Sequence, residues 1–402
     1  MTVLRAIGTA ALLGLLCGAD WRQFRGTEGA GSAPDEKLPV TFGNEGKNVA
    51  WKVPLPGRGP ASPIVVDGRV VVTASSGPRE DRLHVLAFDA TTGERLWHRE
   101  LWATGHTICN AFGAVAGPTP ASDGHLIFAF YSSNDLACFD LAGNLRWFRG
   151  LAYEHPKARN DVGMASSPAV VRDTVIVQIE NQGDSFAAGL DTATGETRWL
   201  TAREAGACWS SPAVLPGATR EQDVVLMQSR SKLTAQNAHT GEQLWEYQTS
   251  CHTMASALVA AGIVYLPSHG LHALKPQPDG RGFERLWYEQ RLSSGASSPV
   301  AQGGRVYTLK SPGILVCGEA KTGEVLWQLR LKGPFWASAT IAGGHAYCVN
   351  HAGEVQVVRL GDEEGELVAT NQIDKAILAS PAAADGAIYF RSDEHLWKVA
   401  FD

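Results

Sequence analysis

Histidines are the residues of this chain that could bind a metal ion, because imidazole is a common metal ligand. Four of them lie in segments without the alternating apolar pattern of a strand: His106, His252, His269 and His351. They are far apart in the sequence, and none forms an HxH or HxxxH pair that would place two ligands together. We therefore expect solvent-facing or hydrogen-bonded histidines and predict no metal site.

Polar side chains that could grip a ligand gather in two long connecting segments. His106 and Asn110 lie in the first, and Arg159, Asn160 and Asp161 lie in the second. A guanidinium beside an amide and a carboxylate could clamp a substrate carboxylate or a sugar. The alternative is a charged, solvated loop.

Two tryptophans, Trp209 and Trp336, precede short apolar runs and stand outside the regular tryptophan spacing described below. Exposed aromatic rings bind peptide strands and sugars through a flat area that loses few rotamers. Burial beneath a loop is the alternative. We take both, together with His252, as candidate binding residues.

Enzyme motifs with strong local signatures are missing. The sequence has no nucleophile elbow, Gly-rich phosphate loop or Walker lysine. The formal charge of −6 comes without a basic block, which argues against nucleic-acid binding. No catalytic residue is predicted, and whether the protein is an enzyme stays open, with a non-enzyme favoured.

The first nineteen residues are typical of a secretory signal peptide. Arg5 precedes an apolar run that is too short to span a bilayer, and small residues end at Ala19. Lipidation of Cys17 is an alternative, although Leu16 stands where a small residue is usual. We expect export to the periplasm or cell envelope, and no later segment could cross a membrane.

Export would permit disulfides. Cys138 and Cys317 lie in strand-like apolar runs and are expected to be buried, inert thiols. Cys109, Cys208 and Cys251 lie in loops, and a Cys208–Cys251 bridge is one possibility.

An internal repeat determines the fold. The segment LAFDATTGERLW ends at Trp97, and related segments recur every 40 to 52 residues. The repeated or equivalent tryptophans are Trp51, Trp97, Trp147, Trp199, Trp245, Trp287 and Trp327, and Ala369 takes the next place. A second marker, a small residue that is usually followed by proline and opens an alternating apolar run, recurs in phase eight times. Its positions are Ser62, Thr119, Ser167, Ser211, Ser256, Ser298, Ser338 and Ser380.

Each unit contains four short strand patterns, with turns in which Gly68 and Gly93 can take positive φ. Eight such units predict an all-β, eight-bladed β-propeller of four-stranded antiparallel blades. The last unit lacks a fourth strand, and the segment around Trp51 is a fourth strand without a unit. We therefore predict ring closure by an N-terminal strand paired with the last blade. The expected division is a signal peptide (1–19), an N-terminal extension (20–48) and a propeller (49–402).

The pattern AxDxxTGxxxW, complete from Ala87 to Trp97, resembles the tryptophan-docking repeat of pyrroloquinoline-quinone-like propellers. The resemblance covers nearly all of the chain after residue 19. That superfamily contains quinone-dependent dehydrogenases and non-enzymatic propellers similar to the outer-membrane protein assembly factor. The dehydrogenases carry adjacent cysteines, calcium ligands and an aspartate base, and this chain has no Cys-Cys pair.

The resemblance therefore implies the non-enzymatic branch: an exported scaffold that binds another envelope protein, an extended peptide or a glycan. No cofactor is predicted. The alternative is an oxidoreductase dependent on pyrroloquinoline quinone or a metal such as calcium, with its site at the channel mouth.

Overall fold

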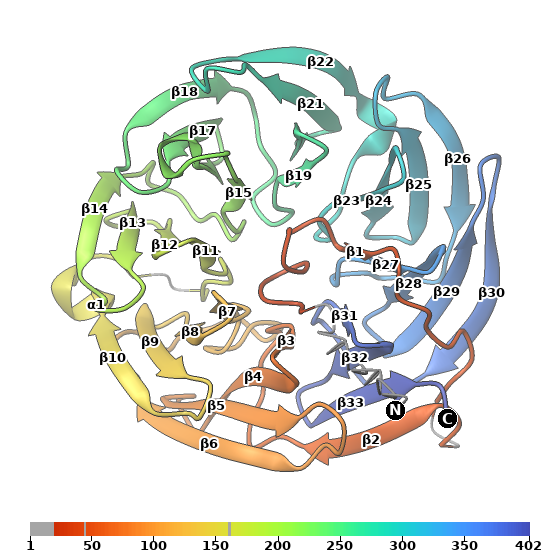
Figure 1. Ribbon diagram of the computed structural model, residues 1–402, viewed down its shortest axis with the longest axis horizontal. Helices are drawn as coiled ribbons and strands as arrows, with labels where there is room; N and C mark the ends of the chain where they lie inside the picture. Colours follow the sequence, from red (N-terminus) through yellow and green to blue (C-terminus); the bar gives the residue numbers. More distant parts are fainter. Residues whose placement is uncertain (1–19, 44–45, 160–161) are drawn as a thin grey trace, which may run out of the picture.

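The computed structural model describes residues 20–43, 46–159 and 162–402. The expected signal peptide lies outside these residues, as do Asn160 and Asp161. Eight small sheets surround one axis, as Figure 1 shows, and confirm the predicted eight-bladed β-propeller.

The first four blades follow the chain from inner to outer strand. Blade 1 has β3 (Ile64–Val66), β4 (Arg69–Ser76), β5 (Arg82–Asp89) and β6 (Arg95–Trp102). Blade 2 has β7 (Ala121–Ser122), β8 (Leu126–Phe130), β9 (Asp135–Asp140) and β10 (Leu145–Gly150). Blade 3 has β11 (Ala169–Val171), β12 (Thr174–Ile179), β13 (Phe186–Asp191) and β14 (Thr197–Ala202). Blade 4 has β15 (Ala213–Leu215), β16 (Val224–Gln228), β17 (Lys232–Asn237) and β18 (Gln243–Gln248).

The other four blades complete the ring. Blade 5 has β19 (Leu258–Ala260), β20 (Ile263–Pro267), β21 (Leu271–Pro276) and β22 (Phe283–Glu289). Blade 6 has β23 (Val300–Gln302), β24 (Arg305–Lys310), β25 (Ile314–Glu319) and β26 (Val325–Arg330). Blade 7 has β27 (Thr340–Ala342), β28 (His345–Val349), β29 (Glu354–Leu360) and β30 (Gly365–Gln372). Blade 8 has β31 (Ala382–Ala384), β32 (Ala387–Arg391), β33 (His395–Ala400) and the N-terminal β2 (Val49–Pro54).

Three short helices and one extra strand lie outside this scheme. They are α1 (Leu151–Glu154), the 3₁₀ turns at Arg220–Gln222 and Gln290–Leu292, and β1 (Ser32–Ala33). β1 pairs in parallel with β27, which gives blade 7 a fifth strand that the repeat did not predict.

The turns of blade 1 show why these residues form a blade. Asp67 (φ 47°) and Gly68 (φ 69°) both take positive φ, as a tight hairpin between β3 and β4 requires. Between β5 and β6, the Asp89 carboxylate accepts the backbone N–H groups of Thr91 and Thr92. These two hydrogen bonds close the turn and lower the pKa of Asp89, the bond from Thr92 contributing most.

The ring closes where the sequence predicted. β2 pairs antiparallel with β33, and Trp51 lies opposite Lys398. Both chain ends therefore contribute to blade 8. β2 supplies the fourth, outer strand of its sheet, in the order β2-β33-β32-β31.

The apolar core lies between neighbouring blades rather than in the middle of the ring. Six of the seven repeated tryptophans donate their indole N–H to a turn carbonyl of the following blade. The pairs are Trp51–Ala90, Trp97–Leu141, Trp147–Thr192, Trp199–Ala238, Trp287–Ala320 and Trp327–Gly361. Each of these rings also lies against a turn glycine of that blade; a Cβ on Gly241 would be 2.8 Å from Trp199.

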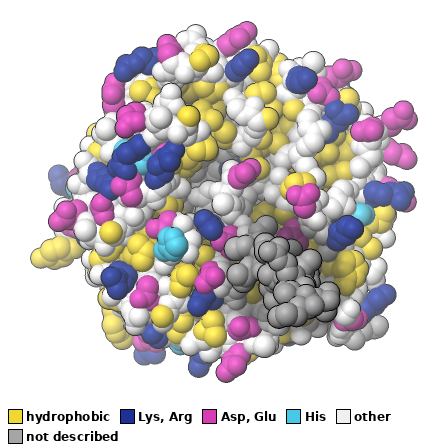
Figure 2. Space-filling view, in the orientation of Figure 1, with side chains coloured by type: hydrophobic (Ala, Val, Ile, Leu, Met, Phe, Trp, Pro, Cys, Tyr) yellow, Lys and Arg dark blue, Asp and Glu magenta, His cyan; other side chains and the backbone are white. Residues whose placement is uncertain are grey.

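Residues 20–43 run across the propeller. Trp21 pairs with Val65 of blade 1, and β1 pairs with blade 7. Figure 1 shows this segment, in red, reaching the centre of the ring. On the visible, described part of the same face, acidic and basic side chains alternate around the edge without a block of one sign (Figure 2).

Candidate functional site

A ladder of hydroxyl groups surrounds the central channel. In blades 1 to 7, the backbone N–H that opens the blade donates to the hydroxyl oxygen that opens the next blade, at 2.9–3.0 Å. The donor–acceptor pairs are Ser62–Thr119, Thr119–Ser167, Ser167–Ser211, Ser211–Ser256, Ser256–Ser298, Ser298–Ser338 and Ser338–Ser380. The small hydroxyl residue recurs because it joins neighbouring blades at the axis.

These eight hydroxyl residues line one cavity of about 260 Å³. Seven of the eight ladder oxygens accept a backbone N–H, the exception being Ser62, and none of the eight O–H groups has a protein acceptor among the described residues. A hydroxyl can donate one hydrogen bond and accept two. The channel therefore presents unused donors to whatever enters it.

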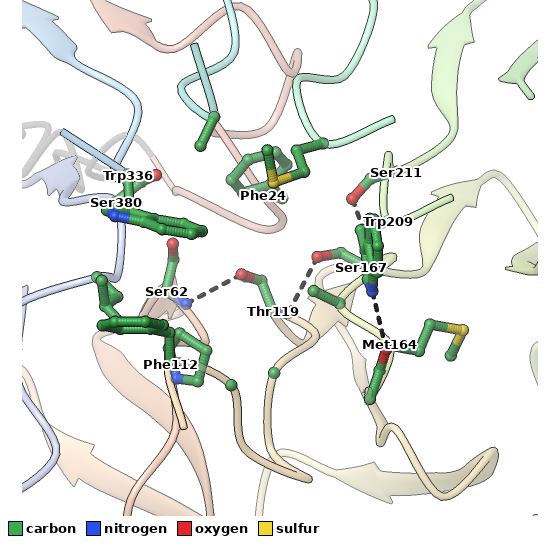
Figure 3. Close-up of a pocket in the computed structure, with 18 of the residues that line it drawn as sticks. Phe24, Ser62, Phe112, Thr119, Met164, Ser167, Trp209, Ser211, Trp336 and Ser380 are labelled. Atoms are coloured by element: carbon green, nitrogen blue, oxygen red, sulfur yellow. Dashed lines mark hydrogen bonds between the residues drawn. The ribbon is translucent and has the colours of Figure 1, made fainter. Parts of the chain in front are cut away.

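Aromatic rings form the mouth of the cavity. Phe112 and Trp336 are stacked, with ring centroids 5.7 Å apart and planes 20° apart, and the edge of His351 meets Phe112. Phe112 is 52% exposed and Trp336 is 38% exposed, so both rings also face solvent. They lie in loops that connect an outer strand to the next inner strand, and the cavity opens toward that face. Figure 3 shows both rings beside Ser62 and Ser380.

Phe24, from the N-terminal segment, supplies another wall of the cavity (Figure 3). Its neighbour Arg25 anchors it, donating to the carbonyls of Ala257 (2.6 Å) and Pro299 (3.1 Å). Arg25 is buried without a carboxylate partner among the described residues, and burial lowers its pKa to about 9. The segment Trp21–Gly26 (WRQFRG) thus places an aromatic side chain in the wall of the channel cavity.

The other predicted site residues fall into two groups. Asn110 and Trp209 line the cavity together with Trp336. Asn110 accepts the N–H groups of Phe112 and Gly113, and so it holds the loop that presents Phe112. The Trp209 indole donates to the Gly163 carbonyl at 2.8 Å.

His106, Arg159 and His252 do not line this cavity. His106 and Arg159 are exposed. His252 borders a separate surface pocket with His269, and its Nδ1 accepts the N–H groups of Met254 and Ala255. Burial first, and the neighbouring His269 second, lower the pKa of His252.

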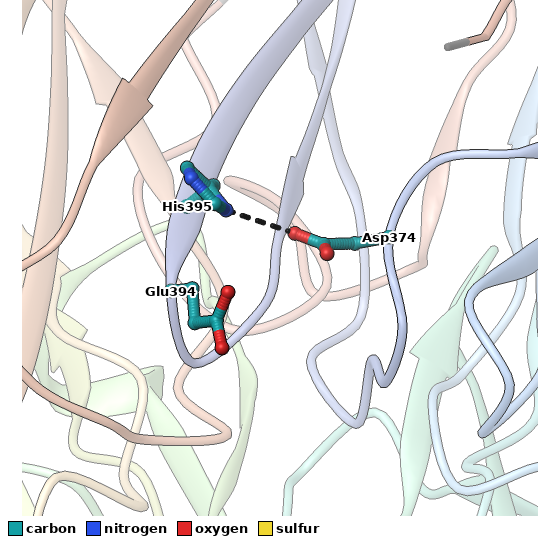
Figure 4. Close-up of side chains that lie close together, drawn as sticks. All are labelled: Asp374, Glu394 and His395. Atoms are coloured by element: carbon teal, nitrogen blue, oxygen red, sulfur yellow. Dashed lines mark hydrogen bonds and ion pairs between the residues drawn. The ribbon is translucent and has the colours of Figure 1, made fainter.

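The structure does not join the four histidines in a metal-binding cluster within its described residues. The side chains of Asp374, Glu394 and His395 do converge, with ligand atoms within 4.8 Å of one another (Figure 4). Asp374 bonds His395 Nδ1 (3.1 Å) and the Ser392 hydroxyl (2.7 Å), which ties two loops of blades 7 and 8 together. These contacts explain the cluster as structural.

All six described cysteines are free thiols, including Cys208 and Cys251, for which a bridge was one possibility. Cys138 and Cys317 are buried in β9 and β25, as expected. Burial raises the pKa of Cys208 to about 11, so its thiol is protonated and unreactive at neutral pH.

The described side chains that line the cavity carry no charge. The described lining has no acidic, basic, histidine or cysteine side chain, so it offers no general acid and no general base that could activate its hydroxyl groups as nucleophiles. A quinone held with calcium needs several ligand oxygens of carboxylate or amide type. Among the described lining residues only Asn110 brings such an oxygen, and backbone N–H groups occupy it, so this group does not fit.

Sequence reasoning missed Phe24, Phe112 and Met164 as cavity residues and treated the eight hydroxyl positions only as strand openings. The in-phase recurrence of Ser and Thr was the available signal, since one residue per blade at the same place must form a ring. Phe112 had no such signal, because its partner Trp336 is more than two hundred residues away.

Comparisons with known proteins agree on the architecture. The family model described as "Outer membrane protein assembly factor BamB" matches residues 35–207, 157–267 and 267–368. None of the curated proteins compared with the chain matches it. The crystal structure of BamB from Moraxella catarrhalis is similar at TM-score 0.63 and 17% identity, covering 88% of this chain and 97% of that one.

Two dehydrogenases are similar as well. A europium-containing methanol dehydrogenase has TM-score 0.70 at 12% identity, over 94% of this chain and 90% of its own. The quinohemoprotein alcohol dehydrogenase from Comamonas testosteroni has TM-score 0.73 at 14% identity, over 96% and 81%. At such identities the structural likeness shows the fold alone. The family model, however, spans most of the sequence, and the chain belongs to the family of the outer membrane protein assembly factor BamB.

Proposed function

We propose that this protein is an exported, non-catalytic binding propeller of the cell envelope, and that its partner engages the channel mouth. The observation that carries the proposal is the neutral cavity itself: stacked, half-exposed aromatic rings above a ring of hydroxyl donors. Such a lining can hold a ligand by stacking and hydrogen bonds. Among its described residues, no acid or base stands ready to activate a hydroxyl for attack on such a ligand.

Family membership supports a binding role, because the matching model is named for an assembly factor. The resemblance to dehydrogenases supports only the shared fold, since the lining does not supply the ligands that their cofactor needs. Loops at one rim of a rigid scaffold are also where binding residues usually lie.

Export is supported by the charged start, short apolar run and small residues of positions 1–19. Within the described residues, no helix has the length and apolar composition that a membrane span requires. Mass measurement of the mature N-terminus tests this part: cleavage near Ala19 is expected, and an intact Met1 in the secreted fraction would contradict it.

A spectroscopic titration tests binding against catalysis. Purified protein receives pyrroloquinoline quinone and calcium, and the visible spectrum and turnover of alcohols and sugars are followed. We expect neither a saturable spectral change nor turnover. Saturable quinone binding accompanied by turnover would overturn the proposal in favour of an oxidoreductase.

A further inference from the structure

We infer that the group that enters the channel cavity is a single neutral sugar ring, free or at the end of a glycan. This inference rests on the proposed function and names its ligand class. It starts from the ladder hydroxyl that neither donates nor accepts a hydrogen bond among the described residues.

Ser62 is that hydroxyl. The ladder contains seven hydrogen bonds for eight positions, and the missing one would reach the Ser62 oxygen from blade 8. Ser62 is only 2% exposed, and no described group donates to its Oγ or accepts from it. In Figure 3 this hydroxyl points to the side of the cavity where Trp336 lies. Ser62 lines the cavity, and its Oγ does not belong to the fully buried, unpartnered side-chain atoms, so a ligand or water in the channel can reach and bond it.

The aromatic mouth supplies the second part of a sugar site. The face of an indole is negatively polarised and attracts the C–H groups on one face of a pyranose. Trp336 leaves part of its surface exposed beside the hydroxyl ring, and Phe112 is stacked on it. A sugar could therefore stack on an aromatic ring while its edge hydroxyls meet the ladder.

Charge and size narrow the ligand class. The described lining has no ionised side chain, so a phosphate or a carboxylate would find no counter-charge in the cavity. The volume of about 260 Å³ is below the roughly 300–1,000 Å³ of sites for drug-sized molecules. One ring fits this space, and the rest of a longer glycan would remain outside the mouth.

The hydrogen bonds that the ladder hydroxyls could make favour a sugar over an apolar side chain as the ligand. A phenylalanine or leucine of a protein partner would also fit an aromatic mouth, but it would leave the Ser62 hydroxyl and the ladder O–H groups unpaired. Sugar hydroxyls both donate and accept, and so they match the ladder group by group.

The test is a calorimetric titration of the purified protein with methyl glycosides of glucose, galactose, mannose and N-acetylglucosamine. N-acetyl-phenylalanine amide serves as a mimic of a peptide side chain. Trp336→Ala should weaken binding of the preferred glycoside by about tenfold or more. Trp102→Ala is the matched control, because Trp102 is 60% exposed on the outer strand β6, and it should leave binding unchanged.

Ser62 gives a second, milder pair of variants. Ser62→Ala removes a hydroxyl that makes no described hydrogen bond, so the fold should persist while glycoside affinity falls about three- to tenfold. Ser62→Thr keeps the hydroxyl, as Thr119 does at the equivalent position of blade 2, and should keep the affinity. This pair stays informative even if Trp336→Ala does not fold.

Binding of one glycoside class with these losses supports the inference. Absence of saturable glycoside binding overturns it, as does binding that neither variant weakens. Binding of the phenylalanine mimic alone overturns the sugar assignment and leaves the proposed binding role standing. Quinone binding with turnover would overturn the proposed function as well.

Discussion

Two joints between neighbouring blades lack a tryptophan indole that is hydrogen-bonded to the following blade, and the two joints are packed differently. Blade 7 has Ala369 where the tryptophan would be, and blade 4 has Trp245, whose N–H finds no acceptor among the described residues. The first joint is filled by another part of the chain. The second leaves a cavity of about 590 Å³ beside the tryptophan.

At the joint of blades 7 and 8 the N-terminal segment replaces the missing ring. Phe42 is 5% exposed, packs 5.6 Å from Phe390, and its N–H donates to the Asn371 side chain. The Tyr347 hydroxyl donates to the Leu38 carbonyl nearby. A segment of the expected N-terminal extension thus supplies the apolar volume that blade 7 lacks.

At the joint of blades 4 and 5 the tryptophan is present but its receptor is not. Trp245 packs on Phe283 at 4.8 Å, and the turn glycine of blade 5, Gly280, has no atom within 4 Å of an added Cβ. The comparison teaches that docking of the tryptophan depends on both neighbouring blades. One blade supplies the indole, and the next must bring a turn carbonyl and a glycine close to it.

The largest expected effect is at the joint of blades 7 and 8. Phe42→Ala should lower the free energy of unfolding by about 3–5 kcal/mol, because it empties a buried site of a ring. Phe401→Ala is the control, since Phe401 is 62% exposed, and should change it by less than about 0.5 kcal/mol. Urea unfolding measures both. Equal losses would mean that Phe42 does not replace the indole.

Two glycine substitutions compare the stability of a joint with a docked tryptophan and that of the joint of blades 4 and 5, where the tryptophan is not docked. Gly241 (φ +72°) lies against Trp199, whereas Gly280 (φ +71°) has open space, so their backbone strain is the same. Gly241→Ala and Gly280→Ala should each cost about 1–2 kcal/mol for positive φ. Gly241→Ala should cost about 1–3 kcal/mol more, because its methyl group overlaps the indole. Indistinguishable unfolding curves would contradict the docking role of the glycine.

Removal of the indole N–H is a smaller change. Trp199→Phe loses the 3.0 Å hydrogen bond to the Ala238 carbonyl, and Trp245→Phe loses none. We expect Trp199→Phe to be more destabilising by about 1 kcal/mol. Thermal unfolding of the two variants side by side checks the difference, and a greater loss for Trp245→Phe would reverse the comparison.

The smallest effect at neutral pH concerns His272, which lies in the joint of blades 4 and 5. It faces Tyr247 of blade 4, Tyr288 and Arg285, and burial lowers its pKa from 6.5 to about 4. The unfolded chain binds a proton below about pH 6.5 while the folded protein does not. The contribution of neutral His272 is therefore present above pH 6.5 and is lost progressively as pH falls toward 4.

His272→Gln removes this titration. Between pH 7 and pH 4 the free energy of unfolding of the variant should fall less steeply than that of the unmodified protein. Parallel curves in that window would show that His272 takes up its proton equally in both states.

The sequence was sufficient to predict the features that recur in every blade, but not the contacts that are made at a single place in the fold. Eight hydroxyl openings and the strand around Trp51 were enough to predict the blade number and the closure, because each signal recurs or completes a unit. The contact of Phe42 with Asn371 and the stacking of Phe112 on Trp336 join residues that are remote in sequence and appear a single time. No local pattern marks such pairs, so the filled joint and the cavity mouth became visible only in three dimensions.

The pairing of β2 with β33 has a consequence for biosynthesis. Apart from the two-residue β1, Val49–Pro54 precedes every other blade strand in the chain, and its partner His395–Ala400 follows all of them. Until these two strands pair, the blades folded so far form an open arc with a bare sheet edge, which other chains could pair with. Any factor that delays this last pairing would expose the arc to proteases and neighbours, and its closure would mark the moment at which the chain becomes resistant to both.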